Sequence, residues 1–434
     1  MKHHDIFQKI FTAFLFLVFS GFHYNALAQE DGWEQMESIN TARIYAGSCV
    51  IDNKIFVFGG CTLPAPGATA SVEVYDTETD EWTVLKNMDQ AKAVVCEVID
   101  DKIYLMGGWA LIDNSWKTIS TNLEYDYKTD NYVEKQSTPI NMAFGVSCVY
   151  NDAIYTFGGS TDNEIIEKSW IYDPTSDTWD SISDIQNKTY GPTVDVINNK
   201  MYATGGCEGS YTSMKISGKV AMYDPDTDSW EEKTELPYPV ADHISVVHKD
   251  KILVFGGDTG VWEIAKSFGT NLIQEYDPVK NNWAIKQCMP FKRSGMAGEK
   301  VGNYVYIISG AENSRNTDEP FLTEVWRFNL DSLKDYVPPL GIEENKIACN
   351  FTLHPNYPNP FREYTQIKYD LQQVGVVRLQ VFNFLGQEVT TLVNKRQSPG
   401  SYEVTWNAED IKPGIYFVKL RVGDISETRK LLVY

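Results

Sequence analysis

The chain has 434 residues, of which 43% are hydrophobic and 13% aromatic, so it has the apolar material for a large buried core. This composition excludes an intrinsically disordered chain and a small disulfide-stapled scaffold. The 59 acidic and 38 basic side chains give a formal net charge of -21, which repels a phosphate backbone and excludes nucleic acid as a partner.

Residues 1–28 have the pattern of a secretory signal peptide. A basic start precedes an apolar run from Ile10 to Phe19, and Ala26-Leu27-Ala28 offers small residues where a signal peptidase cuts. The apolar run is about half as long as the roughly twenty residues that a membrane-spanning helix needs. We therefore expect the mature chain to begin at Gln29 and to contain no transmembrane span.

From residue 29 to 335 the sequence repeats with a period near 50 residues. A β-rich run that ends in a glycine pair, or in Ser-Gly in the last unit, recurs six times, and the second glycines lie 48, 51, 47, 51 and 53 residues apart. In five units a tyrosine is followed seven residues later by another aromatic residue: Tyr75 and Trp82, Tyr125 and Tyr132, Tyr172 and Trp179, Tyr223 and Trp230, Tyr276 and Trp283. This period, with hairpin turn signals and no helical periodicity, predicts a four-stranded β unit repeated around an axis.

These glycine pairs, tyrosines and tryptophans resemble the kelch repeat, which implies an all-β fold built as a β-propeller. The sixth unit departs from the pattern, because Phe328 replaces the tyrosine and Asp335 replaces the tryptophan. Trp33 stands in the missing tryptophan's register, 49 residues before Trp82. We therefore predict a six-bladed propeller whose last blade is completed by the N-terminal strand, which leaves no free sheet edge.

Residues 336–350 lose the repeat, and their Pro-Pro sequence is typical of a linker. Residues 351–434 then alternate polar and apolar residues in short runs, which predicts a small C-terminal β-sandwich. An ordinary carbohydrate-binding or fibronectin-like module is one interpretation of this segment.

The C-terminal segment also carries YPNPF (Tyr357 to Phe361), VFNFLGQEV (Val381 to Val389) and KLLVY (Lys430 to Tyr434). This combination resembles the C-terminal sorting domain of the type IX secretion system. The resemblance implies that the secretion machinery is a partner of this chain. It also implies export through the periplasm to the extracellular space or the outer-membrane surface.

Kelch propellers include copper radical oxidases resembling galactose oxidase, which need two histidine and two tyrosine ligands. Outside the signal peptide the sequence has only His243, His248 and His354, and nothing completes a ligand set. We therefore predict no metal and no cofactor.

Exported kelch propellers also include sialic acid mutarotases (N-acetylneuraminate epimerases), whose sugar anomerisation needs acid and base groups and no metal. Eleven residues before the second glycine, units two, four and six carry Glu97, Asp195 and Glu299. If this register faces the central channel, three carboxyl groups converge there and could act as acid and base or bind a cation. These residues are the candidate catalytic groups, and solvated channel-wall acids are the alternative interpretation.

The loop after each glycine pair and the loop that enters the next blade emerge on the same side of a propeller. Aromatic residues flanked by charges on such loops suit sugar stacking or a protein-binding hot spot. The candidate ligand-binding residues of this rim are Arg43, Trp109, Trp116, Glu164, Tyr190, Tyr211, Asp242, Trp262, Arg293 and Arg315.

No nucleophile elbow, phosphate loop or zinc-binding spacing is present in the sequence. The favoured hypothesis is an exported propeller that binds a glycan or a protein through its loop rim. The alternative is a metal-independent carbohydrate isomerase of the mutarotase kind, and the fold alone does not decide between them.

Overall fold

The computed structural model describes residues 32–65, 67–186, 188–210, 214–259, 269–312, 314, 320–336, 351–371, 375–383, 387–397, 400–409, 411–422 and 425–434. The expected signal peptide and the linker from residue 337 onward lie outside these ranges. Regular structure in the described residues is β-strand apart from a short 3-10 helix, η2 (Leu330–Ser332), which confirms the all-β class. Among these residues, no helix has the length and apolar character needed to cross a membrane.

Each repeat unit folds into one antiparallel sheet, called a blade here, whose strands run in chain order from the centre outward, except that the outermost strand of the last unit comes from the N-terminal segment. Unit 1 comprises β2 (Gly47–Ile51), β3 (Lys54–Phe58), β6 (Val72–Asp76) and β7 (Glu81–Val84). Unit 2 comprises β8 (Lys92–Ile99), β9 (Lys102–Ile112), β11 (Asn122–Asp126) and β12 (Asn131–Lys135), with β10 (Ser115–Thr118) added beside the long β9. Unit 3 comprises β13 (Val146–Tyr150), β14 (Ala153–Phe157), β15 (Ser169–Asp173) and β16 (Thr178–Ser181).

The remaining units follow the same plan. Unit 4 comprises β18 (Thr193–Ile197), β19 (Lys200–Thr204), β22 (Val220–Asp224) and β23 (Ser229–Lys233). Unit 5 comprises β24 (Ile244–His248), β25 (Lys251–Phe255), β26 (Ile273–Asp277) and β27 (Asn282–Ile285). Unit 6 comprises β28 (Ala297–Val301), β29 (Tyr304–Ile308), β30 (Val325–Asn329) and, outermost, β1 (Trp33–Met36). Short pairs in the connecting loops are β4 (Cys61–Thr62) with β5 (Gly67–Ala68), and β20 (Cys207–Glu208) with β17 (Thr189–Tyr190) and β21 (Lys215–Ile216).

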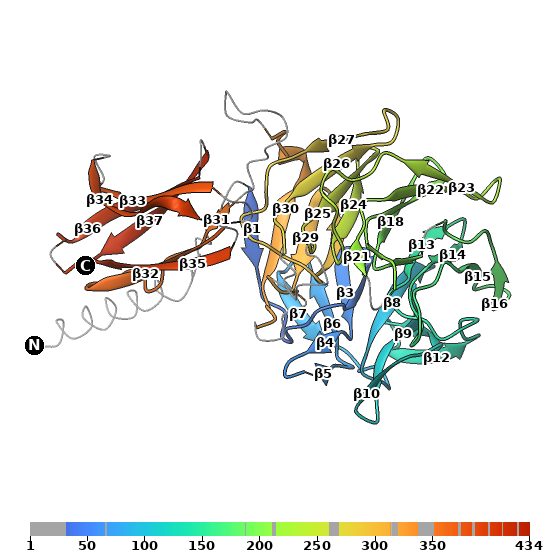
Figure 1. Cartoon of the computed structure of the whole chain (residues 1–434). Coiled ribbons are helices and arrows are strands. Elements are labelled where there is room, and N and C mark those ends of the chain that lie inside the picture. Colours follow the sequence, from blue (N-terminus) through green and yellow to red (C-terminus); the bar gives the residue numbers. More distant parts are fainter. Residues whose placement is uncertain are drawn as a thin grey trace, which may run out of the picture.

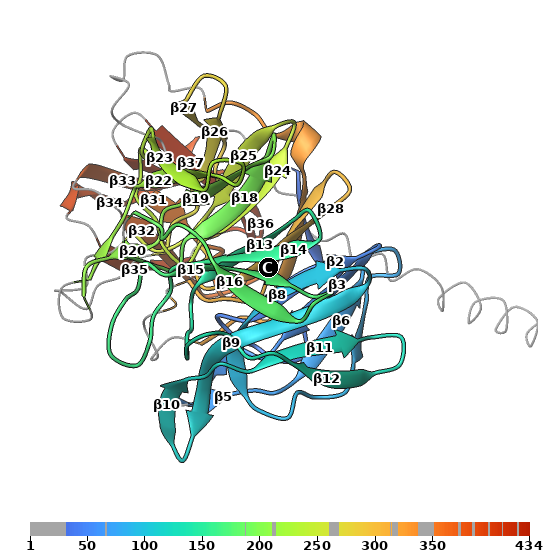
Figure 2. The same cartoon turned by 90° about the vertical axis from the view of Figure 1, so that its right-hand side faces the viewer.

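The blades are arranged in a ring, which confirms the propeller architecture (Figures 1 and 2). The innermost strand of each unit contacts the innermost strands of both neighbouring units, and β28 of the last unit contacts β2 of the first. The outer edge of unit 6 is formed by β1, which pairs antiparallel with β30 and places Trp33 opposite Phe328. Trp33 is fully buried, and its ring stacks on Phe328 with 4.9 Å between ring centroids.

The repeated aromatic residues hold neighbouring blades together. In unit 4 the Tyr223 hydroxyl donates to the Asp228 carboxylate at 2.7 Å, and that carboxylate also accepts from the backbone N–H of Ser183 in unit 3. The indole N–H of Trp230 donates to the Ser183 carbonyl at 3.0 Å. The same tyrosine bond recurs five residues apart in the other units with this motif: Tyr75 to Asp80, Tyr125 to Asp130, Tyr172 to Asp177 and Tyr276 to Asn281. The period that identifies the repeat is therefore also the spacing of the joints between blades.

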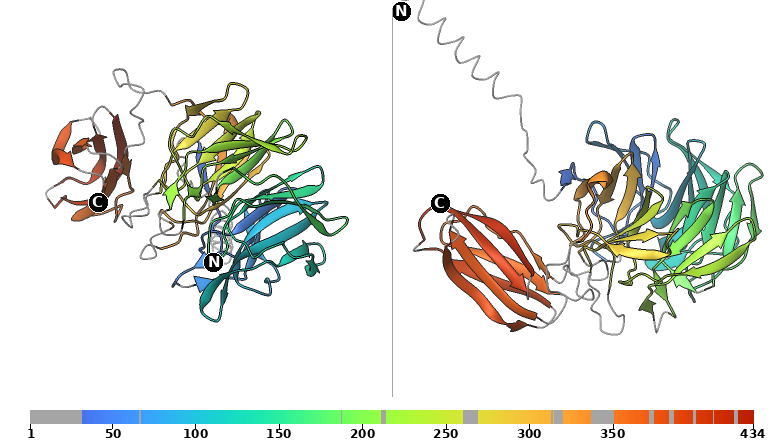
Figure 3. Two further views of the ribbon diagram at one scale, coloured as in Figure 1. Left: turned by 45° about the vertical axis from the view of Figure 1, so that its right-hand side comes forward. Right: turned by 90° about the horizontal axis from the view of Figure 1, so that it is seen from above.

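The C-terminal segment forms the expected β-sandwich, seen as a separate group of strands in Figure 3. One sheet contains β31 (Phe351–Leu353), β32 (Tyr364–Leu371) and β35 (Gly400–Asn407). The other contains β34 (Glu388–Gln397), β33 (Gly375–Asn383), β36 (Gly414–Val422) and β37 (Ile425–Val433). Both sheets contribute to a single apolar core that includes Tyr369 and Trp406.

Candidate functional site

A cavity of about 160 Å³ opens at the propeller centre on the loop side, and it is called the axial pocket here. All six repeat units contribute to its wall through the segments that lead into their innermost strands. The lining includes Tyr45, Val94, Phe144, Pro192, Asp242 and Met296, one residue from each unit. A ligand in this pocket would therefore contact every blade.

The wall of the axial pocket contains strained backbone. Tyr45, Phe144 and Asp242 have φ angles of 56°, 54° and 55°, in the left-handed region that non-glycine residues rarely adopt. All three lie 15 residues before the second glycine of their unit, and two other units carry Gly191 and Gly295 at this position. The turn therefore adopts a positive φ in five units, and three of these units carry a non-glycine side chain there at a cost in strain. Such strain is concentrated at binding and active sites in other proteins.

Five aromatic rings form a continuous group, called the mouth cluster here, which reaches the axial pocket through Tyr45 and Phe144. Trp109 and Trp116 stack with centroids 4.2 Å apart, and Trp109 meets Phe144 edge-on at 5.4 Å. Phe144 in turn lies 4.8 Å from Tyr190 and 5.6 Å from Tyr45. All five side chains are half-buried, so each exposes part of its surface. Rings arranged in this way offer apolar faces to a ligand that also needs polar contacts.

The polar groups of the axial pocket lie beside these rings. The Tyr45 hydroxyl is 3.3 Å from a carboxylate oxygen of Asp242 and 3.3 Å from the hydroxyl of Ser314. His243 forms the next part of the wall, and its Nε2 is 3.1 Å from the Thr193 hydroxyl. Burial lowers the pKa of His243 to about 4, so the imidazole is neutral at pH 7. The pocket therefore combines a phenol, a carboxylate and a neutral imidazole.

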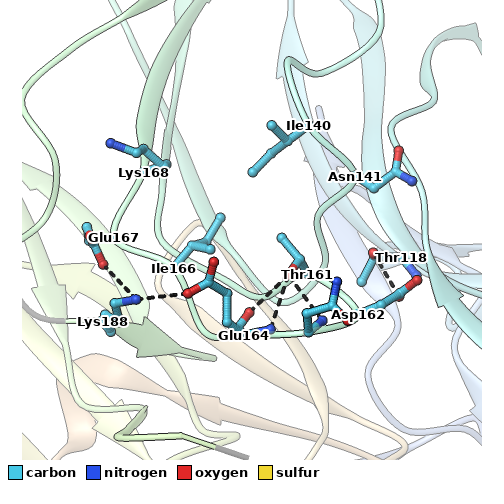
Figure 4. Close-up of a pocket in the computed structure, with 11 residues that line it drawn as sticks. Thr118, Ile140, Asn141, Thr161, Asp162, Glu164, Ile166, Glu167, Lys168 and Lys188 are labelled. Atoms are coloured by element: carbon cyan, nitrogen blue, oxygen red, sulfur yellow. Dashed lines mark hydrogen bonds and ion pairs between the residues drawn. The ribbon is translucent and has the colours of Figure 1, made fainter.

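A larger open groove of about 630 Å³ lies on the same face, between the loops of units 2, 3 and 4 (Figure 4). It adjoins the axial pocket, because the segments 140–145 and 188–192 contribute residues to both linings. The Lys188 ammonium is 3.0 Å from the Glu164 carboxylate and 3.5 Å from that of Glu167, as Figure 4 shows. The groove is thus polar and contains both signs of charge.

Comparison with known families agrees with this geometry. Residues 92–310 match the KLHDC2/KLHL20/DRC7 Kelch-repeats domain, and residues 42–89 match the Kelch motif. The chain belongs to the kelch-repeat family. Residues 356–434 match the Secretion system C-terminal sorting domain. Both resemblances noted in the sequence are confirmed, and the sorting domain implies export by type IX secretion to the cell surface or the extracellular space.

Curated kelch proteins resemble part of this chain. The Kelch-like protein terF of Aspergillus terreus is 27% identical over 237 residues, which cover 52% of each chain. Human Kelch-like protein 15 is 24% identical over 52% of this chain and 40% of its own length, and beta-scruin of Limulus polyphemus is 23% identical over 61% and 30%. The chain therefore spans about half the length of these relatives, or less.

The solved structure of YjhT aligns with this chain at a TM-score of 0.57 and 14% sequence identity. The alignment covers 67% of this chain and 95% of that structure. At this level of identity the likeness shows that the two chains share a fold.

The structure places five of the ten predicted rim residues of this kelch propeller in three surface settings. Trp109, Trp116 and Tyr190 belong to the mouth cluster, Asp242 lies in the axial pocket, and Glu164 lies in the open groove. Tyr211, Trp262 and Arg315 lie outside the described residues.

The two remaining rim candidates, Arg43 and Arg293, are buried rather than presented to a ligand, each with 1% of its surface exposed. Arg43 donates to the Gly59 carbonyl and pairs with the Glu73 carboxylate. Arg293 donates to the Ser309 carbonyl and pairs with Glu324 at 2.7 Å. Both arginines lie 17 residues before the second glycine of their unit. Each donates to the carbonyl of the residue directly before that glycine and so holds the entry loop against its own blade. A structural role accounts for them.

The candidate catalytic acids lie on the innermost strands, and each one bonds sideways to a serine of the next unit. Ser147 donates to Glu97 at 2.6 Å, Ser245 to Asp195 at 2.6 Å and Ser48 to Glu299 at 2.7 Å. Burial raises the pKa of each carboxyl group to about 7, against the lowering effect of the serine bond. The three carboxyl groups do not all lie within 4.8 Å of one another, and none lines the axial pocket, but the charge of Glu299 adds to the raised pKa of Glu97. Their serine bonds join the blades in alternate pairs, unit 2 to unit 3, unit 4 to unit 5 and unit 6 to unit 1.

Among the described residues, Glu312, His354 and Asp370 are the one trio of side chains close enough together to hold a metal ion. The Lys292 ammonium, however, lies 3.1 Å from the same Asp370 oxygen that His354 contacts at 2.7 Å. A cation is therefore already supplied at this place by the protein.

The axial pocket contains three residues that the sequence does not single out as ligand-binding candidates: Tyr45, Phe144 and His243. A signal for the first two exists, because they share the position of Asp242 relative to the glycine pair. The positive φ of that position is not visible in the sequence. His243 is mostly buried, with 6% of its surface exposed, and it also lines the axial pocket. Its side chain therefore packs in the core and borders the space that a ligand would occupy.

Proposed function

We propose that this exported kelch protein is a binding module whose axial pocket and mouth cluster recognise a saccharide. The observation that carries the proposal is the group of five touching aromatic rings beside the strained Asp242. Apolar ring faces with a nearby carboxylate and phenol suit a ligand that has both C–H surfaces and hydroxyl groups.

The charge of the site narrows the class of ligand. Asp242 is acidic, and the two arginines nearest in register, Arg43 and Arg293, are already paired with carboxylates inside their blades. The guanidinium groups of Arg43 and Arg293 are therefore not available to bind the carboxylate of an acidic sugar. A neutral or amino sugar fits the axial pocket better, because hydroxyl and ammonium groups can donate to Asp242.

A glycan array probed with the full chain tests this proposal. We expect binding to neutral or amino saccharides, with affinity lowered at least about tenfold by Trp109→Ala, since a stacked ring and its buried area are lost. Tyr364→Ala is the matched control, because it removes an aromatic side chain that is 54% exposed in the sorting domain. Equal binding by both variants would place the ligand elsewhere, and an array without hits would direct the search to protein ligands.

A second candidate function is a metal-independent sugar mutarotase. It is favoured by the Tyr45 and Asp242 pair, because anomerisation moves one proton from a hydroxyl and delivers one to the ring oxygen. Exchange spectroscopy by NMR on any bound free sugar would detect accelerated interconversion of its anomers. Loss of the accelerated interconversion in Asp242→Asn would assign the chemistry to the axial pocket. Its loss in Glu97→Gln alone would assign the chemistry to the acids of the innermost strands.

A further inference from the structure

The sorting domain contacts the propeller at a specific place on the loop face. Lys292 lies in the loop between β27 and β28, and its ammonium is 3.1 Å from the Asp370 carboxylate of the sorting domain. Asp370 also accepts from His354, whose Nε2 lies 2.7 Å away. Glu312, in the loop after the glycine of unit 6, has a carboxylate oxygen within 4.8 Å of both sorting-domain groups. Two residues of the propeller therefore face a paired histidine and aspartate.

The His354 and Asp370 pair is held by regular structure. Asp370 lies in β32, opposite Thr352 of β31, and His354 directly follows β31. The backbone N–H of His354 donates to the Lys368 carbonyl at 2.9 Å, which fixes the histidine against the same strand. Because both side chains stand on paired strands, the sorting domain presents them in one orientation.

A comparison between repeat units shows how the contact changes the lysine. Lys188 and Lys292 both lie 18 residues before the second glycine of their units, Gly206 and Gly310. The following turn is the same in both units, with Gly191 and Gly295 at φ angles of 62° and 60°. The Lys188 side chain is 45% exposed, whereas that of Lys292 is 8% exposed. The Lys292 ammonium meets a carboxylate of the sorting domain, and Lys188 meets carboxylates of its own face.

The charges at this contact are complementary and mutually dependent. Burial opposes the ionised form of Asp370, but the hydrogen bond from His354 and the charge of Lys292 outweigh it and hold the pKa of this carboxyl well below its usual range. Replacing either Lys292 or Asp370 by a neutral residue would leave the other charge poorly solvated at the contact, which is strongly unfavourable.

We propose that the sorting domain docks on the loop face of the propeller at units 5 and 6, through Lys292 and Glu312 on one side and the His354 and Asp370 pair on the other. The docked domain occupies this sector of the rim next to the axial pocket, since Ser314, two residues after Glu312, contacts Tyr45 of the pocket wall. A ligand of the full chain then enters from units 1 to 4, where the mouth cluster lies. Docking itself does not depend on the ligand proposed above.

Amine labelling of the full chain with an acetylating reagent, read by mass spectrometry, tests the contact. Lys188 serves as the internal reference, because it has the same place in its repeat. We expect Lys292 to react at least about tenfold more slowly than Lys188 in the wild-type chain, since the labelled amine must first leave its buried partner. Asp370→Asn should bring the two rates together.

Small-angle X-ray scattering supplies a second readout that does not depend on one variant folding. Lys292→Ala and Asp370→Asn should both increase the maximum dimension of the full chain. Glu403→Gln is the matched control, since it breaks the Lys368 to Glu403 ion pair within the sorting domain and should leave the dimension unchanged. Equal labelling of Lys292 and Lys188 in the wild type, or unchanged scattering in both Lys292→Ala and Asp370→Asn, would overturn the docking proposal.

Discussion

Three non-glycine residues hold left-handed backbone around the axial pocket, and their side chains provide much of its chemistry. Gly191 and Gly295 occupy the same register in two other units, so this turn does not need a side chain for folding. A glycine with positive φ carries no steric penalty, whereas a bulky or branched side chain does. Under the proposed function, therefore, stability favours glycine at this position, whereas saccharide binding needs the Asp242 side chain.

Asp242→Gly separates these two demands. We expect the free energy of unfolding to stay within about 1 kcal/mol of wild type or to rise, because strain is relieved. Saccharide binding should be lost, because the carboxylate is removed. Thermal denaturation and isothermal titration measure the two effects. The control is Asp250→Gly, an exposed turn residue with a φ of 57° outside the pocket, which should keep both stability and binding.

The buried acids of the innermost strands, Glu97, Asp195 and Glu299, make stability depend on pH in a defined direction. The pKa of Glu97 is raised from 4.5 to about 7 in the folded state, so the folded chain keeps a proton that the unfolded chain has released. Its contribution is therefore full below about pH 4.5 and falls as the pH rises to about 7. One pKa unit corresponds to about 1.4 kcal/mol, so the loss for Glu97 is on the order of 3 kcal/mol.

Glu97→Gln should remove this group's share of the pH dependence. We expect the difference in melting temperature between pH 5 and pH 8 to shrink relative to wild type, because glutamine does not titrate. Glu81→Gln, at an exposed strand position, is the control and should leave the difference unchanged. An undiminished difference in Glu97→Gln would show that this carboxyl is not the source of the dependence.

At the level of the strands, the joints between blades follow directly from the sequence. The tyrosine and the acceptor five residues later recur in units 1 to 5, so the bond is readable as a pattern once the repeat is aligned. The burial of Arg43 and Arg293 is not readable in this way. Their partners Glu73 and Glu324 lie 30 and 31 residues downstream, within β6 and directly before β30, and their side chains face inward only in the folded register. A basic residue in a loop therefore suggests a ligand contact where the fold uses an internal ion pair.

Tyr223→Phe tests the joint between units 3 and 4. We expect a loss of about 1 kcal/mol in the unfolding transition of the propeller, because the Asp228 carboxylate loses one hydrogen-bond donor. Tyr364→Phe removes a hydroxyl from an exposed side chain and should change stability by less than about 0.5 kcal/mol. Chemical denaturation followed by tryptophan fluorescence compares the two variants.

For the whole molecule, the period near 50 residues and the C-terminal motif suffice to predict a propeller followed by a sandwich. Trp33 occupies the repeat position of the tryptophan that unit 6 lacks, which correctly predicts the N-terminal strand that pairs with β30. The axial pocket could not be predicted to the same degree, because its wall comes from six segments that are distant in sequence and meet only when the ring forms. The contact between Lys292 and Asp370 has the same origin, since it joins residues 78 positions apart.

Two tryptophans distinguish ring closure from ligand binding. Trp33→Ala should lower the free energy of unfolding of the propeller by about 3–5 kcal/mol. The substitution removes a fully buried ring of β1 that packs against Phe328 and Phe255. Trp116→Ala removes a half-buried ring from the mouth cluster, so it should cost less stability and weaken saccharide binding. Calorimetry and ligand titration on both variants measure stability and binding. A larger loss of stability in Trp116→Ala than in Trp33→Ala would contradict these roles.

Hydrogen exchange measured by mass spectrometry, with and without the strongest saccharide from the array, tests most directly that the loop face is the binding face. We predict that the ligand slows exchange in the segments that line the axial pocket and the mouth cluster, residues 42–47, 93–95, 106–119, 141–146, 188–193, 241–245 and 295–296. Slowed exchange confined to the turns on the opposite face, such as residues 224–230, would contradict the assignment of the site.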